Sequence, residues 1–108
     1  MTTTTIAAGE DVATLINVLI VTRETQQQLV DVLVEVTEQV MRHRPGFVSA
    51  NIHASLDGTR VVNYAQWRSR EDFQAMLDDP IAREHMSNAG ALGGAEPHLY
   101  QVASVHHV

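Results

Sequence analysis

Residues 47–67 read FVSANIHASLDGTRVVNYAQW, with one strand-like segment on each side of Asp57-Gly58. β-branched and aromatic residues recur in residues 47–54 and 60–67, as is typical of β-strands. Asp-Gly favours a type I′ turn, so the two segments are predicted to form a β-hairpin.

The register of this hairpin decides which side chains share a face. A two-residue turn pairs Ile52 with Asn63, Ala50 with Ala65, and Val48 with Trp67. A three-residue loop with a bulge would instead bring His53 to the face of Asn63, because a shift of one residue exchanges the two faces of a strand. We expect the two-residue turn, since it gathers the apolar side chains of Val48, Ala50 and Ile52 on one buried face.

A strand and a helix are predicted before the hairpin. Residues 14–22, TLINVLIVT, are short and β-branched and predict a strand. Residues 23–44 predict a helix that begins with a capping box, Thr25 with Gln28, although Thr22 is an alternative cap. Its apolar stripe comprises Leu29, Val30, Leu33, Val34, Val36, Val40 and Met41.

A second helix and a last strand are predicted after the hairpin. Ser69 begins the helix with Asp72 at the capping-box position, and Asp79-Pro80 restarts it with Asp as cap and Pro at the first helical position. Residues 89–97, AGALGGAEP, predict a loop, and the alternation over 98–107 predicts a fourth strand.

The resulting order, β-α-β-β-α-β, is the ferredoxin-like α+β arrangement, a four-stranded antiparallel sheet with both helices on one face. The uncovered face would carry apolar side chains, namely Ile16, Val18, Ile20 and Val62. Such a patch is too apolar for water, so we expect a second copy of the chain to cover it in a homodimer. Residues 1–12 are expected to form a flexible tail and residues 13–108 one domain.

The composition excludes several classes of protein. The 108 residues include no cysteine and no lysine, which excludes disulfides, thiolate nucleophiles, Schiff-base catalysis and a phosphate loop with its lysine. The formal charge of −6 would repel a phosphate backbone, so no nucleic acid is expected as a partner. No apolar run approaches the roughly 20 residues that span a bilayer, and no signal peptide is recognised. We therefore expect no membrane partner and a cytoplasmic location.

Two asparagines occupy inward-facing strand positions, where asparagine is uncommon. Asn63 shares a face with Ala65 and Trp67, and Asn17 shares a face with Leu15 and Leu19. A lone asparagine at such a site is more often a satisfied structural amide. However, the first and third strands of a ferredoxin-like sheet pair at its centre, so the two amides could meet and hold a water or a substrate oxygen.

Other side chains have a structural and a functional interpretation. Trp67, the only tryptophan, is either a core aromatic or a flat wall whose indole N–H donates to an oxyanion. Three apolar residues of the second helix, Phe73, Met76 and Leu77, form either plain core or a pocket for a flat ring system.

The six histidines do not predict a metal site. His106 and His107 are adjacent and face opposite ways on a strand, and no H-E-x-x-H pattern occurs. His85 could be an axial haem ligand, although a surface histidine is the commoner case.

The segment from His53 to Trp67, HASLDGTRVVNYAQW, resembles the antibiotic biosynthesis monooxygenase family. It is most similar to the cofactor-independent anthrone oxygenases of aromatic polyketide pathways. Pro45-Gly46-Phe47 and the run from Ser69 to Phe73 also resemble that family, so the specific part of the likeness covers residues 45–73.

The resemblance implies a dimeric α+β barrel that oxidises a polyketide anthrone to a quinone with O₂ and with no flavin, metal or haem. Carried over by position, Asn63 and Trp67 match polar cavity residues, and Asn17 falls on the matching first strand. The implied catalytic residues are therefore Asn17, Asn63 and Trp67. The implied substrate pocket includes Ile52, Phe73, Met76, Leu77 and Met86.

This chain also departs from the family pattern. Some members carry tyrosine where this chain has Ile52 and Phe73, and arginine near Met86, where the nearest arginine here is Arg83. Proton relays through those groups are therefore not carried over. The base is either His53, in the bulged register only, or a water held between Asn17 and Asn63.

Two alternative functions remain open on the sequence. A haem-degrading monooxygenase of the same superfamily would use Asn63 and Trp67 with His85 as ligand. A non-catalytic dimeric module of the same shape would bind a small molecule without consuming O₂.

Overall fold

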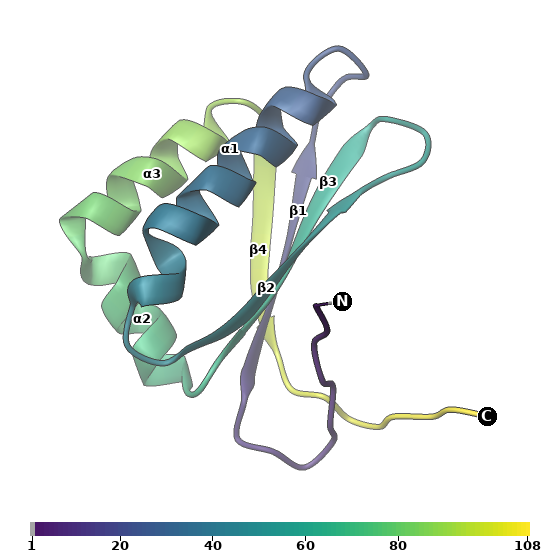
Figure 1. Ribbon diagram of the computed structural model, residues 1–108, viewed down its shortest axis with the longest axis vertical. Helices are drawn as coiled ribbons and strands as arrows, with labels where there is room; N and C mark the ends of the chain where they lie inside the picture. Colours follow the sequence, from purple (N-terminus) through teal and green to yellow (C-terminus); the bar gives the residue numbers. More distant parts are fainter. Residues whose placement is uncertain (1) are drawn as a thin grey trace.

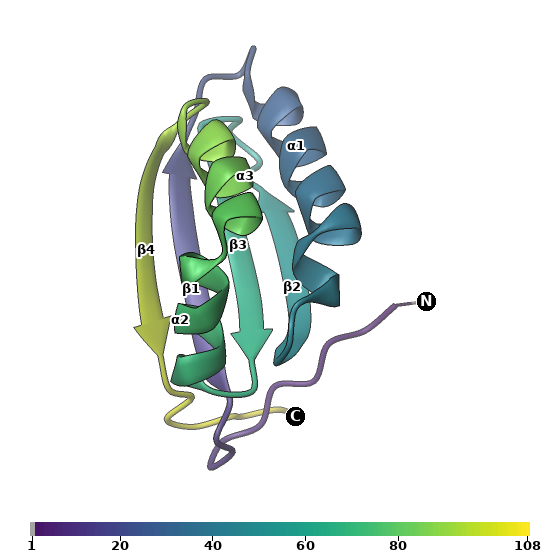
Figure 2. The same cartoon turned by 90° about the vertical axis from the view of Figure 1, so that its left-hand side faces the viewer.

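Residues 2–108 are described by a computed structural model in which four antiparallel strands form one sheet. The strands run in the order β2-β3-β1-β4. The strands and helices are β1 Ala13–Ile20, α1 Gln26–Gln39, the 3₁₀ turn η1 Met41–His43, β2 Phe47–Ala54, β3 Arg60–Trp67, α2 Arg70–Asp78, α3 Pro80–Gly90 and β4 Gly94–Tyr100. All three α-helices lie on one side of the sheet (Figures 1 and 2). The ferredoxin-like fold expected from the sequence is confirmed.

The hairpin has the predicted register but a different turn. Ile52 pairs with Asn63 and Ala50 with Ala65. The Ser55 amide donates to the Arg60 carbonyl at 3.0 Å, so residues 56–59 form a four-residue loop. A type I′ turn needs positive φ at both central residues, but only Gly58 has it (φ 78°), so that prediction is wrong. Loops of two and four residues with the same centre give the same pairing, which is why the register is nevertheless correct.

The first residues of β2 depart from the predicted pairing. An irregularity between Phe47 and Ser49 places Phe47, not Val48, opposite Trp67. Val48 is 46% exposed, so its expected burial is wrong. A bulge inserts one residue and reverses the faces beyond it, and here it turns the larger Phe47 ring toward the helices.

Helix α1 is shorter than predicted. It covers Gln26–Gln39 rather than residues 23–44, and Val40 leaves helical geometry (φ −123°, ψ −62°) before η1. The capping box is also wrong, because Thr25 Oγ1 accepts from the Thr22 amide and makes no cap hydrogen bond. The stripe is buried at Leu29, while Val34 is 46% exposed and does not belong to it.

The predicted starts of α2 and α3 are confirmed. Ser69 Oγ accepts from the Asp72 amide at 3.0 Å at the start of α2. Asp79 Oδ1 accepts from the amides of Ile81 and Ala82 at 2.9 and 3.1 Å, with Pro80 in the first turn of α3.

The last strand begins earlier than predicted. β4 covers Gly94–Tyr100, whereas residues 101–108 form no strand. The predictions of a loop over residues 89–97 and of a strand over 98–107 are therefore wrong. β4 pairs with the free edge of β1 through backbone hydrogen bonds. Such pairing does not require alternating side chains, so the sequence pattern did not indicate where β4 begins. Pro97 is tolerated because β4 is an edge strand. Gly93 allows the approach, since a Cβ there would lie 2.4 Å from the Ile20 carbonyl oxygen.

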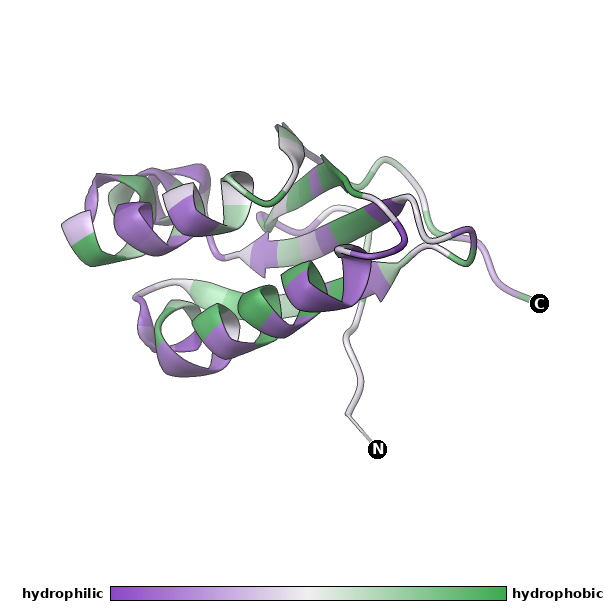
Figure 3. Ribbon diagram, turned by 90° about the horizontal axis from the view of Figure 1, so that it is seen from above, coloured by the Kyte–Doolittle hydropathy of each residue, from purple (hydrophilic) through white to green (hydrophobic). Residues whose placement is uncertain are grey.

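The two faces of the sheet differ as the alternation in β1 predicted. Leu15 and Leu19 are buried beneath the helices, whereas Ile16 and Val18 lie on the open face and are only partly covered. Seen from above, helices and sheet form two layers, and hydrophilic residues cover much of the outward side of the helices (Figure 3). No helix within residues 2–108 has the length and apolar character needed to cross a membrane.

The N-terminal segment contacts the open face. Thr4 Oγ1 donates to Asn51 Oδ1 at 2.6 Å, and Gln66 Nε2 donates to the Thr5 carbonyl at 2.9 Å. Residues 2–12 and the C-terminus lie on this side of the molecule (Figure 1). Residues 2–12 form no helix or strand.

Candidate functional site

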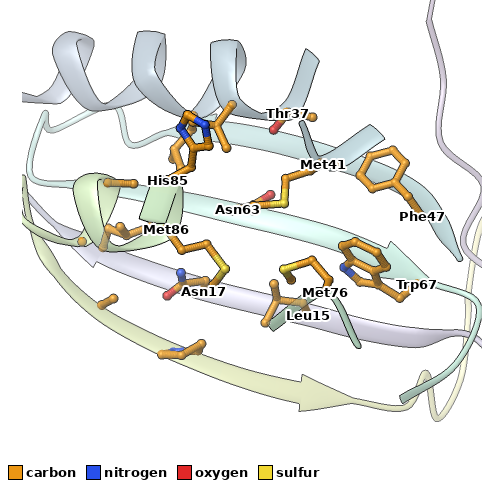
Figure 4. A pocket seen from close by; sticks show the side chains of 18 residues that line it. Leu15, Asn17, Thr37, Met41, Phe47, Asn63, Trp67, Met76, His85 and Met86 are labelled. Carbon is orange, nitrogen blue, oxygen red and sulfur yellow. The ribbon is translucent and has the colours of Figure 1, made fainter. Parts of the chain in front are cut away.

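A cavity of about 140 Å³ lies between the centre of the sheet and the helices α1 and α3 (Figure 4). Its walls are mainly apolar and include Leu15, Leu19, Val36, Met41, Met76 and Ala89. The apolar stripe of α1 and the inward face of β1 both turn toward the core, and the cavity lies between them. Few polar groups enter it, so each one that does has a strong electrostatic effect in this low-dielectric space.

Asn17 on β1 and Asn63 on β3 are paired directly across the ladder. Both line the cavity, as predicted from the sequence. Among residues 2–108, neither Oδ1 atom has a hydrogen-bond partner, although both are buried. A buried polar atom without a partner costs about 1–3 kcal/mol. Rotation about χ2 exchanges the carbonyl and amino groups of an asparagine, so this pair can offer a ligand both donors and acceptors.

Trp67, at the end of β3, forms another wall of the cavity. Its side chain is 2% exposed, and its Nε1 atom is buried without a partner in the described part of the chain. Figure 4 shows this nitrogen turned toward the cavity. Phe47 and Phe73 meet the indole edge-on, with ring centroids at 5.5 and 6.1 Å. These contacts fix the ring, so the indole N–H is a preorganised donor.

His85 lies on the helical side of the cavity, where α3 faces Thr37 of α1 (Figure 4). It is half-buried, so it lines the cavity and is still partly exposed to solvent. Within the described residues it is the only lining side chain that carries an imidazole, since the others are apolar, amide, hydroxyl or indole groups.

The apolar residues expected to bind substrate separate into three groups. Met76 and Met86 line the cavity. Phe73 and Leu77 line a neighbouring pocket of about 240 Å³, which shares Asn17 and Met86 with the first. Ile52 lines neither pocket and packs instead against the cluster around Leu19, so its predicted position is wrong.

His53 also lies away from the site. It pairs with Val62, is exposed, and faces the side of the sheet opposite the helices. His53 therefore cannot act as the base for a reaction inside the cavity.

Several lining residues were missed by the sequence analysis. Thr37, Phe47 and Pro97 all contribute to the wall. Thr37 lies four residues beyond Leu33 on α1, and this helical spacing is the one signal that could have found it. Phe47 enters only because of the bulge, and Pro97 only because β4 starts early.

No cluster of three or more histidine, aspartate or glutamate side chains suited to a metal ion occurs in residues 2–108. The polar groups of the cavity are two amides, one indole N–H, a hydroxyl and an imidazole. This set favours binding of a largely apolar molecule with oxygen substituents.

The sequence is similar to those of known proteins. The antibiotic biosynthesis monooxygenase family model matches residues 13–88. Tetracenomycin-F1 monooxygenase of Streptomyces glaucescens is 48% identical over 98 residues, which cover 91% of this chain and 88% of that protein.

Solved structures have the same fold. The monooxygenase ActVA-Orf6 of Streptomyces coelicolor, in complex with nanaomycin D, has a TM-score of 0.79 at 28% identity, over 92% of this chain and 93% of that one. SnoaB, a cofactor-independent oxygenase from Streptomyces nogalater, has a TM-score of 0.76 at 22% identity, over 88% and 96% of the two chains.

Proposed function

This chain belongs to the antibiotic biosynthesis monooxygenase family, and on that premise we propose that it oxidises an aromatic polyketide anthrone to the quinone with O₂. The relative with 48% identity is a tetracenomycin-F1 monooxygenase, and this name supports a monooxygenase reaction on a related compound. We propose further that the reaction needs no flavin, metal or haem, as the description of SnoaB supports.

The observation that carries this proposal is the pair Asn17 and Asn63, together with the Trp67 N–H, in an apolar cavity. All three side chains have buried polar atoms without a partner in residues 2–108. Neutral donors stabilise the negative charge of an enolate without protonating it. They are therefore suited to a substrate that must remain an anion while it reacts.

The chemistry balances with O₂ as the only co-substrate. An anthrone carbon between two rings loses a proton and leaves a phenolate-like enolate. The enolate gives one electron to triplet O₂, and the resulting radical and superoxide combine to a carbon-bound peroxide. Cleavage of the O–O bond with loss of the second C–H proton releases water and leaves the quinone carbonyl.

The site extends beyond the cavity itself. Typical ligand pockets measure about 300–1,000 Å³, which is more than the cavity of about 140 Å³ alone. The neighbouring pocket of about 240 Å³ shares Met86 with it. Methionine is flexible, so a shift of its side chain would join the two spaces into one elongated site.

We also propose a homodimer formed through the open face of the sheet. Ile16, Val18 and Val62 lie on that face, and Ile20 is 50% exposed. A second copy would cover this patch, which is unfavourable in water.

The test is oxygen uptake with anthrone, using protein shown by metal analysis and absorption spectra to be free of metal and flavin. One O₂ consumed and one anthraquinone formed per anthrone supports the proposal. Binding of anthrone without O₂ consumption would instead indicate a binding module. A requirement for added haem, with a shifted Soret band, would indicate a haem-degrading enzyme.

A further inference from the structure

The proposed oxidation begins with removal of a proton from carbon, which requires a base beside the substrate. Amide, indole and hydroxyl groups do not accept protons at neutral pH. Within residues 2–108, His85 is the only residue lining the cavity that carries an imidazole, the side chain that most often serves as a general base.

His85 and the asparagine pair occupy different walls of the cavity. Asn17 and Asn63 enter the cavity from the central strands, whereas His85 enters it from α3 (Figure 4). A flat substrate between sheet and helices would direct its oxygen substituent at the amides while its reacting carbon lies within reach of the imidazole. The half-buried position also lets the imidazole exchange protons with solvent between turnovers.

We propose that His85 is the general base that takes the proton from the substrate carbon, an inference that rests on the proposed function. The C–H bond breaks, its electron pair remains in the enolate, and the proton moves to the imidazole. After O₂ has combined with the substrate, the imidazolium returns this proton to the peroxide oxygen. His85 then takes the second C–H proton as the O–O bond breaks, and gives it to the departing hydroxide to form water.

The other histidines near the sheet are less suitable. His53 faces away from the cavity. His98 pairs with Ile16 of the open face, does not line the cavity, is 58% exposed at its side chain, and lies 3.6 Å from Glu96. Neither faces the paired amides that would hold the enolate.

The experiment measures proton removal separately from oxidation. Anthrone deuterated at its methylene carbon is incubated with protein in the absence of O₂, and loss of deuterium to solvent is followed by NMR against a buffer control. Wild-type protein should accelerate the exchange, whereas His85→Gln should reduce the acceleration by about 100-fold or more, the usual contribution of a general base. His43→Gln, which changes an exposed histidine of η1, is the matched control and should exchange as the wild type does.

A second variant guards against a purely structural effect. His85→Ala leaves space for a free imidazole molecule, so added imidazole should restore exchange and O₂ uptake to this variant but not to His85→Gln. Exchange by His85→Gln within about threefold of the wild type, no rescue of His85→Ala, or no acceleration by the wild type would each overturn the role of His85. Wild-type exchange that is lost in His85→Gln, but without O₂ uptake by the wild type, would instead refute the proposed oxidation while supporting His85 as a base.

Discussion

Asn17 and Asn63 are direct partners in the β1–β3 ladder, and their side chains enter the same cavity from adjacent strands. Their backbones belong to the two central strands of the sheet, so the separation of the amides is fixed by the ladder. The two buried Oδ1 atoms have no partner in residues 2–108. A fold that keeps two such groups unsatisfied gives up stability, which a bound ligand can recover.

Removal of either asparagine should slow turnover more than it weakens the fold. Asn63→Ala and Asn17→Ala are each expected to lower kcat by about 100- to 1,000-fold, the usual loss for one oxyanion donor. In the double variant, the increase in the activation free energy should be smaller than the sum of the two single increases, because both amides act on one oxygen. Steady-state O₂ uptake measures this.

The matched control is Asn51→Ala. Asn51 lies on β2, and its amide donates to the Tyr64 carbonyl at 2.9 Å and accepts from Thr4, so it does not line the cavity. Its kcat should remain within about twofold of the wild type. Equal losses at Asn51 and Asn63 would contradict the assignment.

The variant Trp67→Phe distinguishes the contribution of the indole N–H from that of the aromatic ring. Phenylalanine retains an aromatic ring between Phe47 and Phe73 but lacks the indole N–H. Loss of one hydrogen bond to a charged group is worth about 1.5–3 kcal/mol, so kcat should fall by about 10- to 150-fold. Near-ultraviolet circular dichroism checks the packing, and an unchanged kcat would show that the N–H takes no part.

Asp79 should be important for stability. Its Oδ1 caps α3, and its Oδ2 accepts from Arg44 Nη1 at 2.7 Å, which ties the end of η1 to the junction of α2 and α3. Asp79→Ala should lower the free energy of unfolding by about 2 kcal/mol, from the lost cap and the lost charged hydrogen bond. Urea denaturation measures it. Asp78→Ala, at the neighbouring exposed position, should change the value by only about 0.5 kcal/mol.

The hairpin loop predicts a specific loss of stability in acid. Hydrogen bonds from the Thr59 side chain, then from the Ser55 side chain and the Thr59 amide, lower the pKa of Asp57 from 3.8 to about 2. A carboxyl whose pKa is lower in the folded state stabilises the fold above its unfolded pKa and loses that effect as the pH falls through the folded pKa. The loss should therefore occur between about pH 4 and pH 2. Asp57→Asn should lessen the decrease of Tm in that range, and parallel Tm curves would contradict this.

The proposed dimer makes a prediction at the open face. Val18 and Val62 are partners in the ladder there. Val18→Asp would place a charge in the apolar contact and should convert the dimer to a monomer in sedimentation equilibrium. Val34→Asp, at a 46% exposed position on α1, should leave the mass unchanged. A monomeric wild type at micromolar concentration would refute the dimer.

The sequence predicted the order of elements and the central pairing because these depend on short-range rules. Alternation in β1 placed Asn17 with Leu15 and Leu19, and the position of Asp57-Gly58 fixed the centre of the hairpin. Caps at Ser69 and Asp79 were also predicted, since each depends on a hydrogen bond to a residue two or three positions away.

The position of His85 in the cavity was decided by tertiary packing. Its helix has apolar and polar residues on several sides, so the sequence alone could not orient it toward α1. The same holds for Phe47, which the bulge turns inward, and for β4, which forms because the edge of β1 offers backbone partners. Local alternation determined that Asn17 and Asn63 lie side by side on one face of the sheet. The packing of α3 and the edge pairing of β4 determined which other residues line the cavity around them. These contacts join residues distant in the chain, and no spacing rule in the sequence encodes them.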